Sequence, residues 1–298
     1  MKAFMDKEFM LQSPTAQHLY HAYAEDMPIC DYHCHIPPRE IYENRRFDNI
    51  AQVWLGGRNP DGSYFGDHYK WRLMRACGVP EALITGDAAP REKFRAWAAC
   101  LETAMGNPLY AWSHMELSMF FGIEDTLTAE SADDIFDRAN AYIKEHHLSP
   151  RKLMLQSHVE LVATTDDPAD SLEYHKEIAK EKTFPVRVVP SFRTDAALNI
   201  CRANYRDYAL HLGEVCGFSV ETLDDLKTAL SKRLDFFCEN GCRVSDIGIE
   251  GFPKEDKSCD AAETFKKALK GKTIPENEFR NFYLKCMCIW RTNTRRIM

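Results

Sequence analysis

The stretch Val159-Glu-Leu-Val-Ala-Thr-Thr-Asp-Asp-Pro168 decides the fold, because it joins a buried strand to the start of a helix. Residues 159–163 form a short apolar run of strand-forming residues, and the polar residues 164–167 follow it directly. Pro168 suits the first turn of a helix, and Asp167 before it is a natural N-cap. The passage therefore predicts a strand that leads straight into a helix through Ala179.

The same order repeats further along the chain. Val186–Val189 predicts a second buried strand, which ends in Pro190-Ser-Phe-Arg193, and 241–245 predicts a short strand that ends at Asp246. Helices are expected between and after these strands, over roughly 196–215, 221–240, 260–270 and 276–288. Strands that alternate with helices predict an α/β fold with a parallel sheet and right-handed crossovers. In a parallel barrel, functional side chains lie where the strands end.

An earlier strand is predicted in Pro28-Ile-Cys-Asp-Tyr-His-Cys-His-Ile-Pro37, which contains strand-forming residues between prolines. Side chains alternate between the two faces of a strand, so His33 and His35 should lie side by side, with Asp31 on the same face. Two such imidazoles can bind one divalent metal ion. A strand end with two ordinary histidines is the alternative. Between about 38 and 157 the pattern predicts helices and loops without a strand, which indicates a helical insertion.

Composition narrows the function classes. The chain has 298 residues, of which 45% are hydrophobic and 28% charged, with a net charge of −7. These values are typical of a globular protein and do not suggest binding to nucleic acid or to an anionic membrane. No apolar stretch approaches membrane-spanning length, and the first residues contain no apolar signal core. The eleven cysteines without a signal sequence are typical of reduced thiols in a cytoplasmic protein.

The predicted strand ends gather the residues that could carry chemistry, namely His33, His35, Thr165, Asp166, Arg193 and Asp246. A catalytic zinc ion needs three or more protein ligands, so Asp246 could add one to the histidine pair. Arg193 suits a carboxylate or phosphate, because its guanidinium group can bond two oxygens at once; pairing with Asp195 is the equally weighted alternative. The acidic run around Asp167 favours a helix cap over a site.

A further candidate is Tyr69, in the segment Asp67-His-Tyr-Lys-Trp-Arg72. The segment could be the first turn of a helix with Trp71 buried, or Tyr69 could act in proton transfer. Spacing alone leaves both open. The chain has no P-loop, no Gly-x-Gly-x-x-Gly and no Gly-x-Ser-x-Gly, which disfavours a nucleotide cofactor and serine-hydrolase chemistry.

Together these motifs resemble the uronate isomerase family, also called glucuronate isomerase, of the amidohydrolase superfamily. The matching segments occur in family order over nearly the whole chain to about residue 285. They are Phe-Met-Asp-Lys-Glu-Phe-Met-Leu (4–11), Asp-Tyr-His-Cys-His-Ile-Pro-Pro (31–38), Asp-His-Tyr-Lys-Trp-Arg-Leu-Met-Arg (67–75), Gly-Asn-Pro-Leu-Tyr (106–110), Thr-Thr-Asp-Asp-Pro (164–168), Pro-Ser-Phe-Arg (190–193) and Gly-Cys-Arg-Val-Ser-Asp (241–246).

The resemblance implies a (β/α)8 TIM-type barrel, of which this chain holds the N-terminal part with about four strands and the helical insertion after strand one. It implies isomerisation of hexuronates, D-glucuronate to D-fructuronate and D-galacturonate to D-tagaturonate. By the same resemblance, His33 and His35 are metal ligands, usually for zinc, Tyr69 is catalytic and Arg193 binds the substrate carboxylate. A cytoplasmic location is expected, and a homo-oligomer for the full-length enzyme.

The chain departs from the family after about residue 285. We expect an incomplete barrel domain over 1–285, with the insertion over about 38–157, and a tail over 286–298 that does not resemble the family; a frameshift near residue 288 is our hypothesis for it. The family's later half supplies a metal-site histidine and a Thr-Asp-Ser-Arg motif, neither of which occurs here. The alternatives are therefore an inactive truncated fragment of the isomerase or a metal-dependent hydrolase of the same superfamily.

Overall fold

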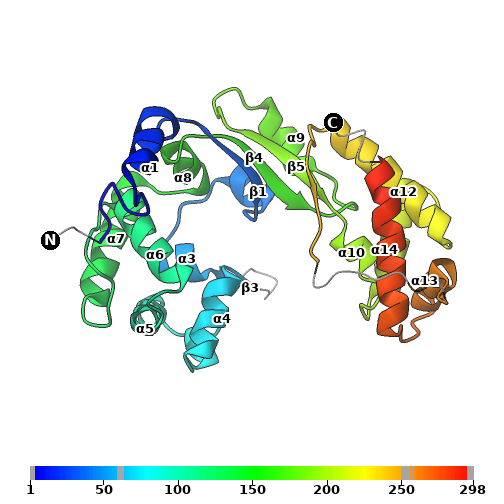
Figure 1. Cartoon of the computed structure of the whole chain (residues 1–298), viewed down its shortest axis with the longest axis horizontal. Coiled ribbons are helices and arrows are strands. Elements are labelled where there is room, and N and C mark those ends of the chain that lie inside the picture. The colour runs from blue at the N-terminus through cyan, green and yellow to red at the C-terminus, as the bar shows by residue number, and fades with distance from the viewer. Residues whose placement is uncertain (1–3, 59–63, 250–255, 257, 294–298) are drawn as a thin grey trace. The chain divides into compact units, whose positions relative to one another are not determined.

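The computed structural model describes residues 4–58, 64–249, 256 and 258–293, and these residues form two compact units (Figure 1). The barrel unit comprises Ile29–Glu43 and Val159–Met298, and the helical unit comprises Met1–Pro28 and Asn44–His158. The sequence predicts the insertion over about 38–157, whereas α2 (Pro38–Glu43) belongs to the barrel unit. Its Tyr42 ring packs 5.6 Å from that of Tyr174 on α9 (Glu173–Lys180).

A four-stranded parallel sheet forms the centre of the barrel unit. Its strands are β1 (Ile29–Cys34), β4 (Val159–Asp166), β5 (Arg187–Arg193) and β6 (Ser245–Asp246), in the order β1-β4-β5-β6. Each pair is parallel, with Val162 opposite Val188 and Arg193 opposite Asp246. The predicted parallel sheet, with helices between its strands, is confirmed.

The sheet curves as the wall of a barrel does. Neighbouring strands are about 4.8 Å apart, so β1 and β6 would be separated by roughly 14 Å in a flat sheet of this order. The side chains of His33 on β1 and Asp246 on β6 nevertheless approach to 3.2 Å. They therefore converge on the concave face, as expected for half of a parallel barrel.

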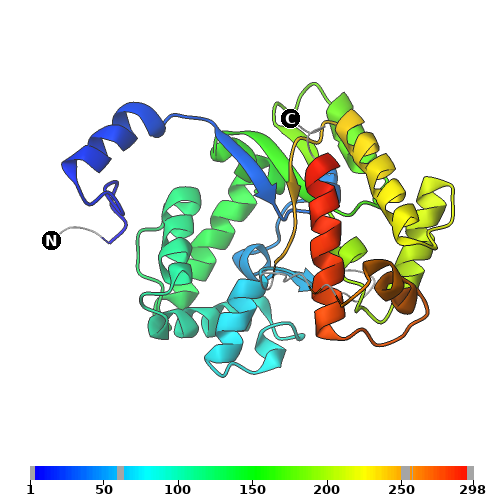
Figure 2. The same ribbon diagram turned by 45° about the vertical axis from the view of Figure 1, so that its right-hand side comes forward.

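The other helices of the barrel unit are α9, α10 (Asp195–Leu198), α11 (Tyr205–Cys216), α12 (Leu223–Glu239), α13 (Ala261–Leu269) and α14 (Glu276–Asn293). Of these, α9 and α12 make the main packing contacts with β5, and the rest pack against α12 or one another. The ring of Phe192 on β5 packs edge-on against that of Phe237 on α12, at 4.9 Å between ring centroids. Phe265 and Phe282 stack between α13 and α14, and both are fully buried. Figure 2 shows α14 in red beside α12 and α13.

The prediction of a helix from Pro168, capped by Asp167, is wrong, because α9 begins only at Glu173. The buried Arg233 explains the delay: its Nε donates to the carbonyl of Pro168 at 2.6 Å, and its Nη2 to that of Asp170 at 2.7 Å. Carbonyls engaged in this way are not available for a helix ladder. Asp167 instead accepts from the nitrogen of Ala169 at 2.8 Å, within a turn.

The single helix predicted over 196–215 is also wrong, because it is broken into α10 and α11. Leu198, Ile200 and Tyr205 are all buried. Positions two apart do not share a helix face, so one straight helix could not bury both Leu198 and Ile200. The hydroxyl of Tyr205 donates to the carbonyl of Ala197 at 2.9 Å and fixes the bend.

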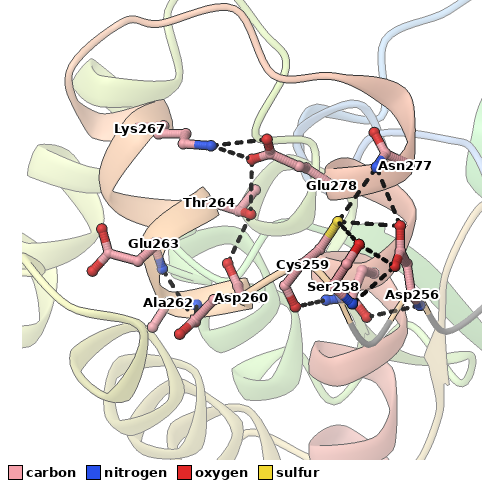
Figure 3. Close-up of polar contacts among 11 residues, drawn as sticks. Asp256, Ser258, Cys259, Asp260, Ala262, Glu263, Thr264, Lys267, Asn277 and Glu278 are labelled. Atoms are coloured by element: carbon pink, nitrogen blue, oxygen red, sulfur yellow. Dashed lines mark hydrogen bonds and ion pairs between the residues drawn. The ribbon is translucent and has the colours of Figure 1, made fainter.

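Polar side chains tie α13 to α14 (Figure 3). Asp260 caps α13 by accepting from the nitrogens of Ala262 and Glu263. Glu278 on α14 accepts from the Thr264 hydroxyl at 3.2 Å and from Lys267 at 2.8 Å. The remaining contacts centre on the carboxylate of Asp256, which accepts from Ser258, Cys259 and Asn277.

Of the predicted tail over 286–298, the structure describes the backbone of 286–293. Helix α14 continues through residue 286 to Asn293, and of 287–293 only the backbone is described. Residues 294–298 lie outside the described part of the chain. The different origin predicted for this tail stays a prediction.

The helical unit packs its own core. Its helices are α1 (Pro14–Leu19), η1 (Tyr20–Ala24), α3 (Ile50–Leu55), α4 (His68–Ala76), η2 (Glu81–Leu83), α5 (Pro90–Thr103), α6 (Pro108–Phe121), α7 (Ala132–His146) and α8 (Pro150–Gln156). Trp54 stacks on Phe94 at 5.6 Å, and Phe94 packs against Phe136. Among the described residues, no helix has the length and apolar character needed to cross a membrane.

One small hairpin corrects the prediction that this region contains no strand. Strands β2 (Gly57–Arg58) and β3 (Tyr64–Phe65) pair antiparallel. Two-residue strands are too short to give an alternating pattern. Gly56 allows the hairpin to close, since its φ is +76° and a Cβ there would lie 1.7 Å from the carbonyl oxygen of Phe65.

Candidate functional site

The two histidines predicted as a pair lie next to each other at the end of β1. His33 is within the strand, and His35 follows its last residue. Their Nε2 atoms are 2.9 Å apart, and their rings are 4.7 Å apart in an edge-on arrangement. The Asp31 carboxylate, expected on the same face, accepts from the backbone nitrogen of His33 at 3.3 Å. The strand end thus presents two converging imidazole nitrogens.

The separation of these nitrogens suits a shared metal ion. Zinc binds imidazole nitrogen at about 2.0–2.1 Å, and two such bonds would span 2.9 Å at an angle of about 90°. The pair therefore fits two neighbouring positions around one divalent ion. Within the described ranges, no group of three or more His, Cys, Asp or Glu residues could hold a metal ion.

Asp246 approaches the pair from β6, but on the other side of the ring. Its Oδ2 lies 3.2 Å from Nδ1 of His33, whereas Nε2 is the atom that faces His35. Asp246 is therefore placed to orient the ring of His33 and not to act as a third ligand of a metal ion between the two Nε2 atoms. The Oδ1 atom of Asp246 is buried and makes no hydrogen bond with any described residue.

Arg193 joins the same cluster from the end of β5. Its Nη1 donates to Oδ2 of Asp246 at 3.0 Å, and its Nε donates to Asp195. The predicted pairing with Asp195 is therefore confirmed. Nη2 makes no hydrogen bond within the described part of the chain, so this nitrogen of the guanidinium group can donate to an anion.

Gly248 lies beside Nη2 of Arg193. Its nitrogen donates to Oδ1 of Asp195 at 2.9 Å. A Cβ at this position would lie 3.1 Å from that oxygen and 3.5 Å from Nη2 of Arg193. The absence of a side chain thus leaves room at the nitrogen that an anion would contact.

Asp166, which the sequence places among the strand-end residues, faces α9 instead. It is 2% exposed and lies 3.7 Å from Nε2 of His175, a residue that sequence reasoning missed. The hydroxyl of Thr164 joins the two side chains, at 2.7 Å from each. Ser191 adds a bond from its backbone nitrogen to Asp166 at 3.2 Å. From the sequence, only the alternation of side chains along the strand around residue 166 could have indicated that Asp166 faces α9.

Burial suppresses charge in this second cluster. Desolvation raises the pKa of Asp166 to about 7, although bonds from Thr164 and Ser191 favour its ionised form. Desolvation also lowers the pKa of His175 to about 4. Nδ1 of His175 is buried without a described hydrogen-bond partner, so a proton there would have no acceptor. The cluster is suited to a structural role.

Tyr69 lies in the helical unit, at the start of α4. Asp67 caps this helix by accepting from the nitrogens of Tyr69 and Lys70, and Trp71 donates to the Leu55 carbonyl at 2.9 Å. The predicted helical turn is confirmed, with Trp71 partly buried. The Tyr69 side chain is exposed and lies against the ring of His68. Its role in proton transfer stays a prediction.

Sequence comparisons identify the family. Residues 1–296 match the family described as glucuronate isomerase. The uronate isomerase of Lachnospira eligens is 49% identical over 285 residues, and that of Caldicellulosiruptor bescii is 47% identical over 283 residues. Each match covers 95% of this chain but only 58% and 59% of the relative. The chain therefore spans little more than half the length of these curated relatives.

Solved structures agree with this assignment. The uronate isomerase from Thermotoga maritima aligns over 99% of this chain and 63% of its own, with a TM-score of 0.84 and 31% identity. The glucuronate isomerase from Caulobacter crescentus aligns over 93% of this chain and 58% of its own, with a TM-score of 0.77 and 27% identity. With its four-stranded parallel half-barrel and its sequence match from residue 1 to 296, the chain belongs to the uronate isomerase family.

Proposed function

We propose that this chain supplies the metal-binding and carboxylate-binding part of an aldose–ketose isomerase for hexuronates. The substrates would be D-glucuronate and D-galacturonate, converted to D-fructuronate and D-tagaturonate. The observation that carries the proposal is the convergence of His33 and His35, at the end of β1, with Arg193, at the end of β5, through Asp246 on β6. The relatives named as uronate isomerases support the same reaction.

The reaction needs both kinds of group. Moving the carbonyl from C1 to C2 takes a proton from C2 and delivers one to C1, through an enediolate that carries negative charge. A divalent metal, which we propose to be zinc held by His33 and His35, would stabilise that charge when bound. The family and the 2.9 Å separation of the two nitrogens support this assignment.

The protein's own side chains would bind and orient the substrate. A hexuronate carries a permanent carboxylate, which Nη2 of Arg193 can bond while Asp195 and Asp246 hold its other nitrogens. Tyr69 would exchange a proton with a substrate oxygen. A cytoplasmic location and a homo-oligomer of the complete enzyme belong to the same proposal.

Two alternatives make different use of the same residues. Two histidines provide fewer ligands than a catalytic zinc site uses, so the chain by itself would be a binding fragment without turnover. A metal-dependent hydrolase would retain the histidine pair but would not require Arg193 to hold a sugar carboxylate. Assays on an uronate and on a neutral lactone separate these functions.

A chimera tests the proposal directly. The corresponding 58% of the Lachnospira eligens uronate isomerase would be replaced by this chain, so that the remaining length is present. We expect zinc-dependent conversion of D-glucuronate, which His33→Ala reduces by more than about 100-fold. His146→Ala, at the end of α7 in the helical unit, serves as the matched control. A folded chimera that hydrolyses a lactone but leaves uronates unchanged would contradict the proposal.

A further inference from the structure

We propose that Asp246 is a positioning residue, which fixes His33 in the tautomer that can bind a metal ion and holds Arg193 with the same oxygen atom. The inference rests on the proposed function, because it assigns a role within that same site. It concerns the state of the protein before any metal or substrate binds.

The first step is the tautomer of His33. Nδ1 of His33 lies 3.2 Å from Oδ2 of Asp246, and a lone pair on Nδ1 would face the negative charge of the carboxylate, so a neutral ring is expected to carry its proton on Nδ1. Nε2 then keeps its lone pair, and this is the atom that faces His35 at 2.9 Å. A carboxylate beside the outer nitrogen of a ligand histidine orients that ligand.

The second step is the shared oxygen. Oδ2 of Asp246 also accepts from Nη1 of Arg193 at 3.0 Å, while Oδ1 is buried and bonds no described residue. Among the described residues, the polar contacts of this carboxylate are therefore the hydrogen bond from Arg193 and the ion-pair contact with His33. A shift of Asp246 would displace the metal-facing nitrogen and the carboxylate-binding guanidinium together.

The third step is the placement of Asp246 itself. It is opposite Arg193 in the ladder between β5 and β6, and it is the last residue of a two-residue strand. Asp195, the other carboxylate on Arg193, is fixed separately by the nitrogen of Gly248. Both acids thus hold Arg193, but only Asp246 contacts His33 among the pairs that the structure describes. Asp195 therefore provides a matched control.

The test is nitrogen NMR of the metal-free 298-residue chain with ¹⁵N-labelled histidine, in which His33→Gln assigns the His33 signals. We expect the wild-type ring to be protonated at Nδ1. In Asp246→Ala the Nε2–H form should gain population, whereas Asp195→Ala should keep the wild-type tautomer. A structural role alone would not move the tautomer of a folded chain.

Zinc titration of the same proteins gives a second readout. Asp246→Ala should weaken Zn²⁺ binding by about 10–100-fold, and Asp195→Ala should change it by less than about threefold. Asp246→Asn keeps the volume and one acceptor, so it should fold and give an intermediate affinity even where Asp246→Ala does not fold. An unchanged His33 tautomer and unchanged affinity in Asp246→Asn and Asp246→Ala would overturn the inference.

The result also separates this inference from the proposed function. A wild-type chain that shows the Nδ1–H tautomer but binds no zinc would uphold the role of Asp246 in positioning His33 and would count against the metal site. The opposite result would be a wild-type chain that binds zinc through His33 and His35 and an Asp246→Ala chain with the same zinc affinity and the same His33 tautomer. That result would uphold the metal site and would overturn the role of Asp246.

Discussion

Two polar clusters of the barrel unit use the same residue types for opposite purposes. On the concave face, His33 and Asp246 remain partly exposed, at 40% and 23% of their side chains, and Nε2 of His33 faces Nε2 of His35 at 2.9 Å. Between the sheet and α9, Asp166 and His175 are almost fully buried, and burial disfavours the charge of each. The difference shows that the same residue types differ in solvation between the two clusters, and that burial in the second disfavours their charged forms.

The largest expected effect concerns Asp166→Asn. The folded state holds the proton of Asp166 up to about pH 7, whereas an unfolded chain releases it near 3.8, so the wild type loses stability as pH rises between these values. The variant lacks this loss and keeps an acceptor for Thr164 and Ser191. Urea unfolding should show the variant gaining up to about 4 kcal/mol relative to the wild type from pH 4 to 7. A constant difference would show that Asp166 is not protonated by burial.

His175→Gln should act in the opposite direction. The folded state keeps His175 neutral down to about pH 4, whereas an unfolded chain takes up a proton near 6.5, so the wild type loses stability as pH falls through this window. Relative to the wild type, the free energy of unfolding of His175→Gln should therefore rise by at most about 3 kcal/mol as pH falls from 6.5 to 4. The measurement is again urea unfolding, with His146→Gln as a control at an exposed helix end. Parallel pH profiles of wild type and variant would contradict the assignment.

Zinc should stabilise the chain through the concave cluster alone. At ten times its Kd, a bound ion stabilises the native state by about 1.4 kcal/mol. The corresponding rise in Tm should disappear in His35→Ala and persist in His175→Gln. A rise that persists in His35→Ala would place the ion elsewhere.

The smallest effect is expected without metal. Exposed side chains whose main partners are one another contribute little to folding, so His33→Ala should change the free energy of unfolding by no more than about 0.5 kcal/mol. Chemical unfolding in the presence of a chelator measures this. A loss several times larger would mean that the strand end is a structural cluster like the one around His175.

The amino-acid sequence predicts the strands well where a buried apolar run is available. Val159–Ala163 and the residues before Arg193 are such runs, and the parallel order follows from the helices between them. It does not predict the late start of α9, because buried Arg233 reaches the Pro168 carbonyl from 65 positions away, or the break after Leu198, where buried Tyr205 bonds the Ala197 carbonyl across the bend. Such tertiary hydrogen bonds override local helix signals.

The candidate site was predictable only in part, because a local pattern determines some of its contacts and the assembly of distant strands determines the others. Alternation along one strand places His33 beside His35, so local pattern was sufficient there. The contact between Asp246 and His33 depends on the curvature of four strands and on the pairing of β6 with β5, which no local pattern contains. The face taken by Asp166 likewise depends on where its strand begins.

The most direct test of the central claim is the stoichiometry and affinity of Zn²⁺ for the wild-type chain, His33→Ala and His35→Ala, measured by calorimetry. The account predicts one ion per wild-type chain and a loss of at least about 100-fold in affinity when either histidine is removed. Equal affinity in all three proteins would contradict it, since the paired imidazoles at the end of β1 would then not be the metal ligands.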